Sequence, residues 1–91
     1  MMKKMQNHES ALVRINEHNN GAKELISYTT RVLKLSSDGW LQVYGLYSAT
    51  TRKHISWFMR GELGLSYQLA KQLYDDNIEY NINTGEFRKV E

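Results

Sequence analysis

The chain has 91 residues, contains no cysteine and carries a formal net charge of +2 at pH 7. This length corresponds to one small domain, and the lack of cysteine excludes disulfides, thiolate metal sites and cysteine nucleophiles. The hydrophobic fraction of 41% is typical of a globular chain rather than a disordered one. No apolar run approaches the ~20 residues of a membrane span, and the polar start lacks the apolar core of a secretory signal. We therefore expect a cytoplasmic protein.

Charge is unevenly distributed along the chain. Residues 23–60 hold six basic and two acidic side chains, whereas residues 62–91 hold three basic and six acidic ones. The middle of the chain therefore suits an anionic partner, and the C-terminal third suits a basic one. An ordinary solvated surface is the alternative explanation for both segments.

The first part of the chain predicts a tail and then a short strand. Residues 1–10 are polar and predict a flexible tail before a single domain over residues 11–91. Residues 11–18 alternate in polarity like a strand but also place two apolar residues at helical spacing, and we favour the strand. Asn20-Gly21 follows and is a strong turn signal, because both residues tolerate positive φ.

Residues 25–35 are rich in β-branched and aromatic side chains and predict one strand. The apolar pattern changes phase partway along it, which indicates a bulge or a strand covered on both faces. Asp38-Gly39 predicts a hairpin turn, and residues 40–48 predict the returning strand. Both faces of that strand are apolar, so we expect helices or a second copy of the chain to cover them.

The apolar period becomes helical after residue 48. Thr50 or Thr51 is expected to cap a helix that extends to residue 60, and Gly61 is expected to end it as a left-handed cap. Ser66 is expected to cap a second helix. Helical spacing predicts that the inward positions are Ile55, Phe58 and Met59 in the first helix and Leu69, Ala70, Leu73 and Tyr74 in the second.

The end of the chain predicts a second hairpin. The second helix is expected to stop at Asn77, which tolerates the left-handed conformation. Ile78, Tyr80 and Ile82 then alternate with polar residues before a turn at residues 83–85. The order is β-β-α-α-β-β, with an optional N-terminal strand. The fold class is therefore α+β, an antiparallel sheet of two hairpins with a helical hairpin on one face.

Residues that carry catalytic or metal chemistry are sparse. The three histidines, His8, His18 and His54, do not have ligand spacing, so we expect no metal and no cofactor. Ser48, Thr51 and His54 are close in sequence, but neither a glycine elbow nor an evident orienting acid accompanies them. Because threonine often caps helices, capping is the better explanation, and we expect no enzyme activity.

The most unusual cluster lies in the first predicted helix. With the apolar stripe inward, Arg52, Lys53, Ser56 and Arg60 project outward or sideways, and Trp57 lies at the boundary. Such a face is compatible with a solvated amphipathic helix and with a protein interface, in which Trp and Arg dominate the binding energy. It is also compatible with nucleic-acid contact, through phosphate pairing and base stacking.

Tyrosines in the strand over residues 40–48 provide a second candidate surface. If the helices hide only one of its two apolar faces, the other face is a candidate site for a dimer or a partner. Tyr44 and Tyr47 are the expected apolar anchors. The predicted partner-binding residues are Arg52, Lys53, Trp57, Arg60, Tyr44 and Tyr47.

Two segments resemble a known family. Residues 27–32 (Ser-Tyr-Thr-Thr-Arg-Val) and 47–55 (Tyr-Ser-Ala-Thr-Thr-Arg-Lys-His-Ile) are similar to small uncharacterised domains encoded by phages, prophages and plasmids of Gram-positive bacteria. The Thr-Thr-x-x-His-Ile element is the most specific part of this resemblance. The resemblance implies a small cytoplasmic accessory protein of a mobile element, of a kind that binds host machinery and includes anti-CRISPR proteins.

These observations lead to two functional hypotheses. The first is a non-enzymatic accessory protein that binds a host protein or ribonucleoprotein, with inhibition of host defence as the implied role. The alternative is a small nucleic-acid-binding regulator that uses the basic helix over residues 50–60. We further expect a homodimer through the uncovered sheet face, and no contact with membranes.

Overall fold

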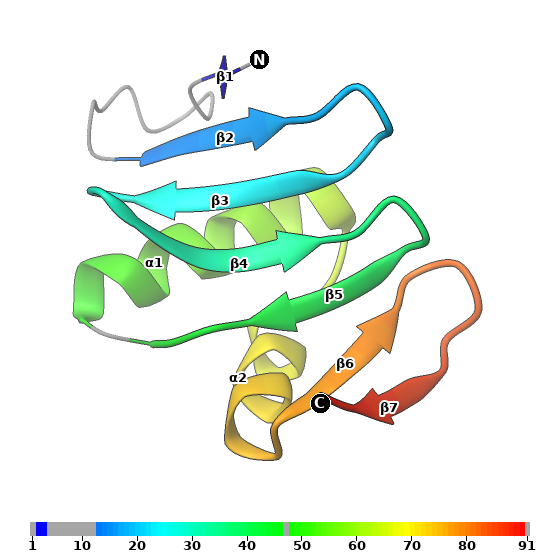
Figure 1. The fold of residues 1–91 in the computed structure, drawn as a ribbon. Coiled ribbons are helices and arrows are strands. Elements are labelled where there is room, and N and C mark those ends of the chain that lie inside the picture. Colours follow the sequence, from blue (N-terminus) through cyan, green and yellow to red (C-terminus); the bar gives the residue numbers. More distant parts are fainter. Residues whose placement is uncertain (1, 4–12, 47, 91) are drawn as a thin grey trace.

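The computed structural model describes residues 2–3, 13–46 and 48–90. Seven strands form one antiparallel sheet whose spatial order follows the chain, and the helical segments lie against one of its faces (Figure 1). No helix within the described ranges is long and apolar enough to cross a membrane. The elements are β1 (Met2–Lys3), β2 (Val13–Glu17), β3 (Lys23–Ser27), β4 (Thr30–Leu35), β5 (Trp40–Val43), α1 (Ala49–Phe58), the π-helical segment η1 (Met59–Leu63), α2 (Tyr67–Asp75), β6 (Ile78–Asn81) and β7 (Phe87–Lys89).

The predicted α+β class is confirmed, with a correction to the number of strands. The three strands β3 to β5 stand in place of the first predicted hairpin, so that with β2 four strands precede the helices, and the two-residue β1 pairs with β2. β2 confirms the short strand predicted within residues 11–18, and β6 and β7 confirm the final hairpin. Residues 4–12, which include most of the predicted tail, lie outside the described residues.

The prediction of one strand over residues 25–35 is wrong. The chain reverses at Tyr28 and Thr29, so that Ser27 pairs with Thr30 and β3 runs antiparallel to β4. Tyr28 has a φ of 60°, in the left-handed region that aromatic residues rarely adopt. The two turning residues include no glycine, asparagine or proline, and the sequence therefore resembles an uninterrupted strand.

Other features of the sheet agree with the sequence pattern. The register between β3 and β4 shifts after Leu25, which confirms the predicted bulge. Gly21 and Gly39 have φ values of 93° and 97°, as the two predicted turns require. The strand predicted over residues 40–48 is shorter, because β5 ends at Val43.

The helix predicted over residues 50–60 is confirmed as α1, but both of its ends differ from the prediction. Ser48 is the N-cap in place of a threonine, and its hydroxyl accepts a hydrogen bond from the Thr51 amide at 3.1 Å. At the other end, the chain continues through Gly61 in a π-helical turn that brings Leu63 against the core. Gly64, with a φ of 67°, supplies the left-handed cap that was predicted three residues earlier.

The start and end of α2 are confirmed. The Ser66 hydroxyl accepts a hydrogen bond from the Leu69 amide at 3.4 Å, and Asn77 is left-handed with a φ of 53°. Ala70 and Leu73 are buried as predicted. Tyr74 is 44% exposed, so its predicted inward position is wrong. The step of about 100° from Leu73 carries its ring out of the core-facing stripe.

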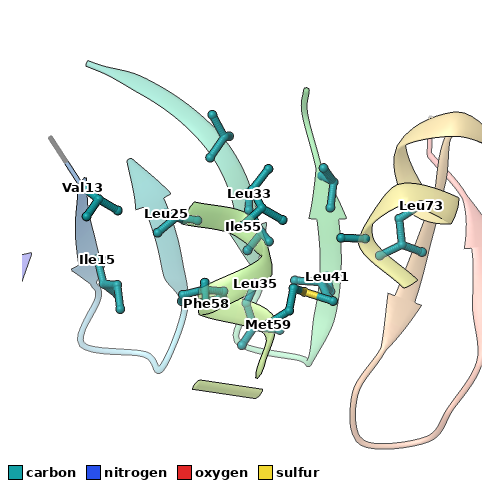
Figure 2. Close-up of a cluster of buried hydrophobic side chains, with 13 residues drawn as sticks. Val13, Ile15, Leu25, Leu33, Leu35, Leu41, Ile55, Phe58, Met59 and Leu73 are labelled. Carbon is teal, nitrogen blue, oxygen red and sulfur yellow. The ribbon is translucent and has the colours of Figure 1, made fainter. Parts of the chain in front are cut away.

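The hydrophobic core lies between the sheet and the helices (Figure 2). Ile55, Phe58 and Met59 are completely buried in it, which confirms the predicted inner side of the first helix. Each strand from β2 to β5 directs alternate side chains toward them. The strand residues of the core are Val13, Ile15, Leu25, Val32, Leu33, Leu35, Leu41 and Val43.

The described helices cover only one face of the sheet. In β5, Leu41 and Val43 are buried toward the helices, whereas Trp40 and the following Tyr44 are half-buried on the other side. Of the two apolar faces predicted for this strand, one therefore packs against the helices and the other does not. We call the side opposite the helices the helix-free face.

Phe58→Ala tests the core assignment. Loss of this completely buried ring is expected to lower the free energy of unfolding by about 3–5 kcal/mol, because apolar burial is lost and a cavity remains. Urea denaturation followed by circular dichroism measures the change. The chain's other phenylalanine, Phe87, is 48% exposed, and Phe87→Ala is expected to lower the same quantity by about 1 kcal/mol or less. Similar losses in the two variants would contradict the assignment.

Candidate functional site

The exposed side of the first helix carries a positively charged surface. Arg52, Lys53 and Arg60 are exposed, and Ser56 and Trp57 are half-buried between them. Positions 52 and 56, and likewise 53 and 57, lie one helical turn apart and share a side of α1. We call these five residues the α1 surface. Their placement agrees with the predicted outward direction of the cations.

Arg52 and Lys53 lie on a helix without acidic residues, because none occurs in the ten residues of α1. Arg60 follows in η1, which also contains Glu62. Within the described part of the chain, no carboxylate forms an ion pair with Arg52, Lys53 or Arg60. Trp57 packs against the edge of the core. The α1 surface therefore combines three solvated cations with a half-buried indole.

A buried polar network lies beneath the first half of α1. Ser27 of β3 and His54 are 1% and 3% exposed, and the Ser27 hydroxyl forms a hydrogen bond with His54 Nδ1 at 2.9 Å. Thr51 is also buried, with its Oγ1 3.3 Å from the Ser27 hydroxyl. Thr51 Oγ1 accepts a further hydrogen bond from the Ser48 hydroxyl at 3.2 Å. The network joins the start of α1 to β3.

A hollow of about 350 Å³ opens beside this network. Ser27, Tyr28 and Thr30 line it from the β3–β4 turn, and Ser48 and Thr51 line it from the start of α1. The Tyr28 ring lies 6.3 Å from the His54 ring, measured between centroids. The two segments on which the family resemblance is based thus meet at one place in the structure. Because the Ser27 hydroxyl is almost fully buried, its bond to His54 is best explained as a structural link between strand and helix.

Tyr44 is separated from the α1 surface by the sheet. Its ring lies beneath the guanidinium of Arg31, with 4.7 Å from Arg31 Cζ to the ring centroid. Arg31 in turn pairs with Glu24 at 2.6 Å, and Glu24 alternates with the buried Leu25, so this group lies on the helix-free face. The predicted partner-binding residues are therefore divided between two faces. Tyr47 lies outside the described residues.

Glu24 is the centre of the polar contacts on the helix-free face. Its carboxylate accepts hydrogen bonds from Arg31 and from Asn16 Nδ2, and lies 2.9 Å from His18 Nε2. The hydrogen bond from Arg31 is the main reason that the pKa of Glu24 lies below its ordinary value, and the contact with His18 acts in the same direction. Burial raises the pKa of the neighbouring Tyr44 hydroxyl. This face is therefore ordered by charge-assisted hydrogen bonds.

Sequence reasoning missed Ser27 and Arg31 as members of these groups. Ser27 is two residues from Leu25, and this alternation is the signal that could have placed its hydroxyl on the buried face. Arg31 could be placed within reach of Glu24 only once the turn at Tyr28 was known. Among the described residues, no group of three or more His, Asp or Glu side chains is arranged to hold a metal ion.

Comparison with known proteins places this small α+β domain in a family. Residues 1–79 match the model of a group described as "Family of unknown function (DUF8033)". The match covers most of the chain, and the protein belongs to this family. No curated protein and no solved structure gave a significant match.

Ser27→Ala tests the buried network. The substitution removes the partner of His54 Nδ1 and a contact of Thr51, and is expected to lower the free energy of unfolding by about 1–3 kcal/mol. Urea denaturation provides the measurement. Ser37 is exposed in the turn before β5, and Ser37→Ala is expected to change the stability by less than about 0.5 kcal/mol. A Ser27→Ala effect no larger than that of the control would show that the network contributes nothing.

Glu24→Gln tests the charge contacts of the helix-free face through pH. Because the pKa of Glu24 is lowered by folding, its ionised form stabilises the fold above the ordinary value of 4.5, and this contribution is lost as pH falls through the folded pKa. Below pH 4.5 the wild type is expected to lose stability more steeply than Glu24→Gln. Urea midpoints measured from about pH 7 to about pH 3 provide the comparison.

The matched control is Glu86→Gln, which changes an exposed carboxylate that forms no ion pair with the described residues. This variant is expected to follow the wild type across the pH range. Parallel curves for the wild type and Glu24→Gln would refute the stabilising role of the Glu24 carboxylate.

Proposed function

We propose that this protein is a non-enzymatic accessory protein of a mobile element that binds a host protein or ribonucleoprotein through the α1 surface. The observation that best supports this function is the presentation of Arg52, Lys53 and Arg60 on the solvent side of a helix whose inner side is completely buried. Core packing already orders this backbone. Binding of a partner therefore costs less conformational entropy than it would if the binding segment were flexible.

Trp57 favours a protein partner for this surface. Trp and Arg dominate the binding energy of protein interfaces, where a partly buried ring is surrounded by polar groups that exclude water. The half-buried Trp57 of α1 follows Lys53 by one helical turn and precedes Arg60 of η1. A partner with an apolar centre and acidic groups around it would complement this arrangement.

Inhibition of host defence, of the anti-CRISPR type, is the role that the sequence resemblance supports. A net charge of +2 does not provide the strong acidity by which a protein imitates DNA. The proposed inhibitor therefore acts by contact with a protein or an RNA–protein complex. This function requires stoichiometric binding and no catalytic group.

The experiment is retention of host-lysate proteins on the immobilised protein, with and without nuclease, compared between the wild type and three variants. Arg52→Glu and Trp57→Ala are each expected to reduce retention of a specific partner by about tenfold or more. Lys71→Glu, at an exposed lysine of α2, is the matched charge-reversal control and is expected to retain the partner. Circular dichroism verifies that each variant is folded.

Two results would overturn the proposal. The first is equal retention of every partner by all variants, which would remove the α1 surface from binding. The second is retention that disappears with nuclease, falls steeply with salt and does not depend on Trp57. That result would support the nucleic-acid-binding alternative instead.

A further inference from the structure

The helix-free face carries the same three-residue arrangement twice. In the first, Glu24 pairs with Arg31 at 2.6 Å, and Arg31 Cζ lies 4.7 Å from the centroid of Tyr44. In the second, Glu79 pairs with Arg88 at 2.7 Å, and Arg88 Cζ lies 3.8 Å from the centroid of Trp40. We call these two groups the Tyr44 stack and the Trp40 stack.

Each stack holds a guanidinium against a ring and leaves much of the arginine in solvent. The two carboxylates are largely buried, whereas the side chains of Arg31 and Arg88 are 48% and 53% exposed. An arginine held at two points has already lost most of its rotamer freedom. Arginine planes and aromatic rings held in this way are the surfaces on which unpaired bases stack.

The spacing of the two stacks is compatible with a flexible polymer that carries planar bases. Trp40, Gln42 and Tyr44 alternate on one side of the strand, and Trp40 and Tyr44 are roughly 13 Å apart along it. Lys34 of β4 pairs in register with Gln42 of β5, which lies midway between Trp40 and Tyr44 along the chain, and with Glu24 of β3, the carboxylate of the Tyr44 stack. An ammonium at this position could contact a phosphate between two stacked bases.

The charges of this face favour an anionic partner. Both carboxylates of the stacks are already paired with arginines, and Lys34 forms no ion pair within the described residues. No described helix or strand lies against the sheet on the side opposite the helices (Figure 1). A duplex keeps its bases inside, so it cannot use flat platforms of this kind, whereas a single strand can.

We propose that the helix-free face binds single-stranded nucleic acid, with bases on the Tyr44 and Trp40 stacks and the backbone beside Lys34. This inference does not rest on the proposed function, because it uses the other face of the sheet from the α1 surface. It adds a second binding activity to the domain.

The experiment measures fluorescence anisotropy of labelled oligo(dT) and oligo(rU) of about 12 nucleotides, a usual site length, with a duplex of equal length as comparison. The wild type is expected to bind the single strands at least tenfold more tightly than the duplex. Tyr44→Leu and Trp40→Leu remove a ring but keep each Glu–Arg pair, and each is expected to weaken single-strand binding about tenfold.

Lys34→Gln tests the phosphate contact. It is expected to reduce the slope of log affinity against log salt concentration by about 0.7, measured between roughly 50 and 200 mM salt. Lys71→Gln is the control, because this lysine is exposed and belongs to α2, one of the helices on the other side of the sheet. It is expected to leave both the affinity and the slope near the wild-type values.

Intrinsic fluorescence provides an independent measurement. The chain has two tryptophans, so Trp57→Phe leaves Trp40 as the single reporter. Stacking of a base on the Trp40 group is expected to quench its emission in proportion to the anisotropy change.

Three results would overturn the inference. They are no binding of either oligonucleotide at low salt, equal affinity for the duplex, or binding that Arg52→Glu abolishes while Tyr44→Leu and Trp40→Leu retain it. The last result would move the nucleic-acid site to the α1 surface.

Discussion

Ile55, Phe58 and Met59 are completely buried against the sheet, and this contact determines where the other features of the domain lie. It fixes the rotation of α1 about its axis, and that rotation directs Arg52 and Lys53 into solvent. It also covers one face of β3 to β5. Apart from Ser27, which bonds to His54 beneath α1, the polar and aromatic residues named for these strands lie on the other face. Both candidate surfaces thus follow from one apolar contact.

Apolar packing alone does not select one position of a helix along a sheet, because the hydrophobic effect has no direction. The hydrogen bond between Ser27 and His54 provides this selection, since it joins one atom of β3 to one atom of α1. A helix displaced by one turn would leave a buried hydroxyl and a buried imidazole without these partners, which costs about 1–3 kcal/mol for each group. The polar network therefore adds specificity to a packing that would otherwise tolerate sliding.

The sequence was sufficient to predict features that depend on local period and turn chemistry. The inner side of α1 followed from the spacing of Ile55, Phe58 and Met59, and two turns followed from Gly21 and Gly39. Helix ends were less predictable, because Ser48, Thr50 and Thr51 are all good caps and only backbone geometry distinguishes them. The π-helical turn after α1 was not predicted, because Gly61 within it indicated a helix end, whereas the left-handed cap falls at Gly64.

The stacks of the helix-free face could not be predicted, and the reason is the turn at Tyr28. In one continuous strand, Glu24 and Arg31 would be roughly 23 Å apart. The reversal at Tyr28 and Thr29 brings them within 2.6 Å and places Arg31 over Tyr44. An aromatic residue in the left-handed region is a rare event that sequence rules do not anticipate. Tertiary packing must stabilise this conformation of Tyr28. The contacts that depend on the turn therefore cannot be predicted from the local sequence.

The strand order from β1 to β7 also affects how the chain reaches this structure. Each strand pairs with its neighbour in sequence, and among the described connections the longest runs through the helices between β5 and β6. Short loops have a small closure entropy, so the β2 to β5 meander can assemble one hairpin at a time. Contacts between strands that are close in sequence are associated with faster folding than long-range contacts are. For a small domain without disulfides, this topology limits the time during which its apolar strands are open to aggregation.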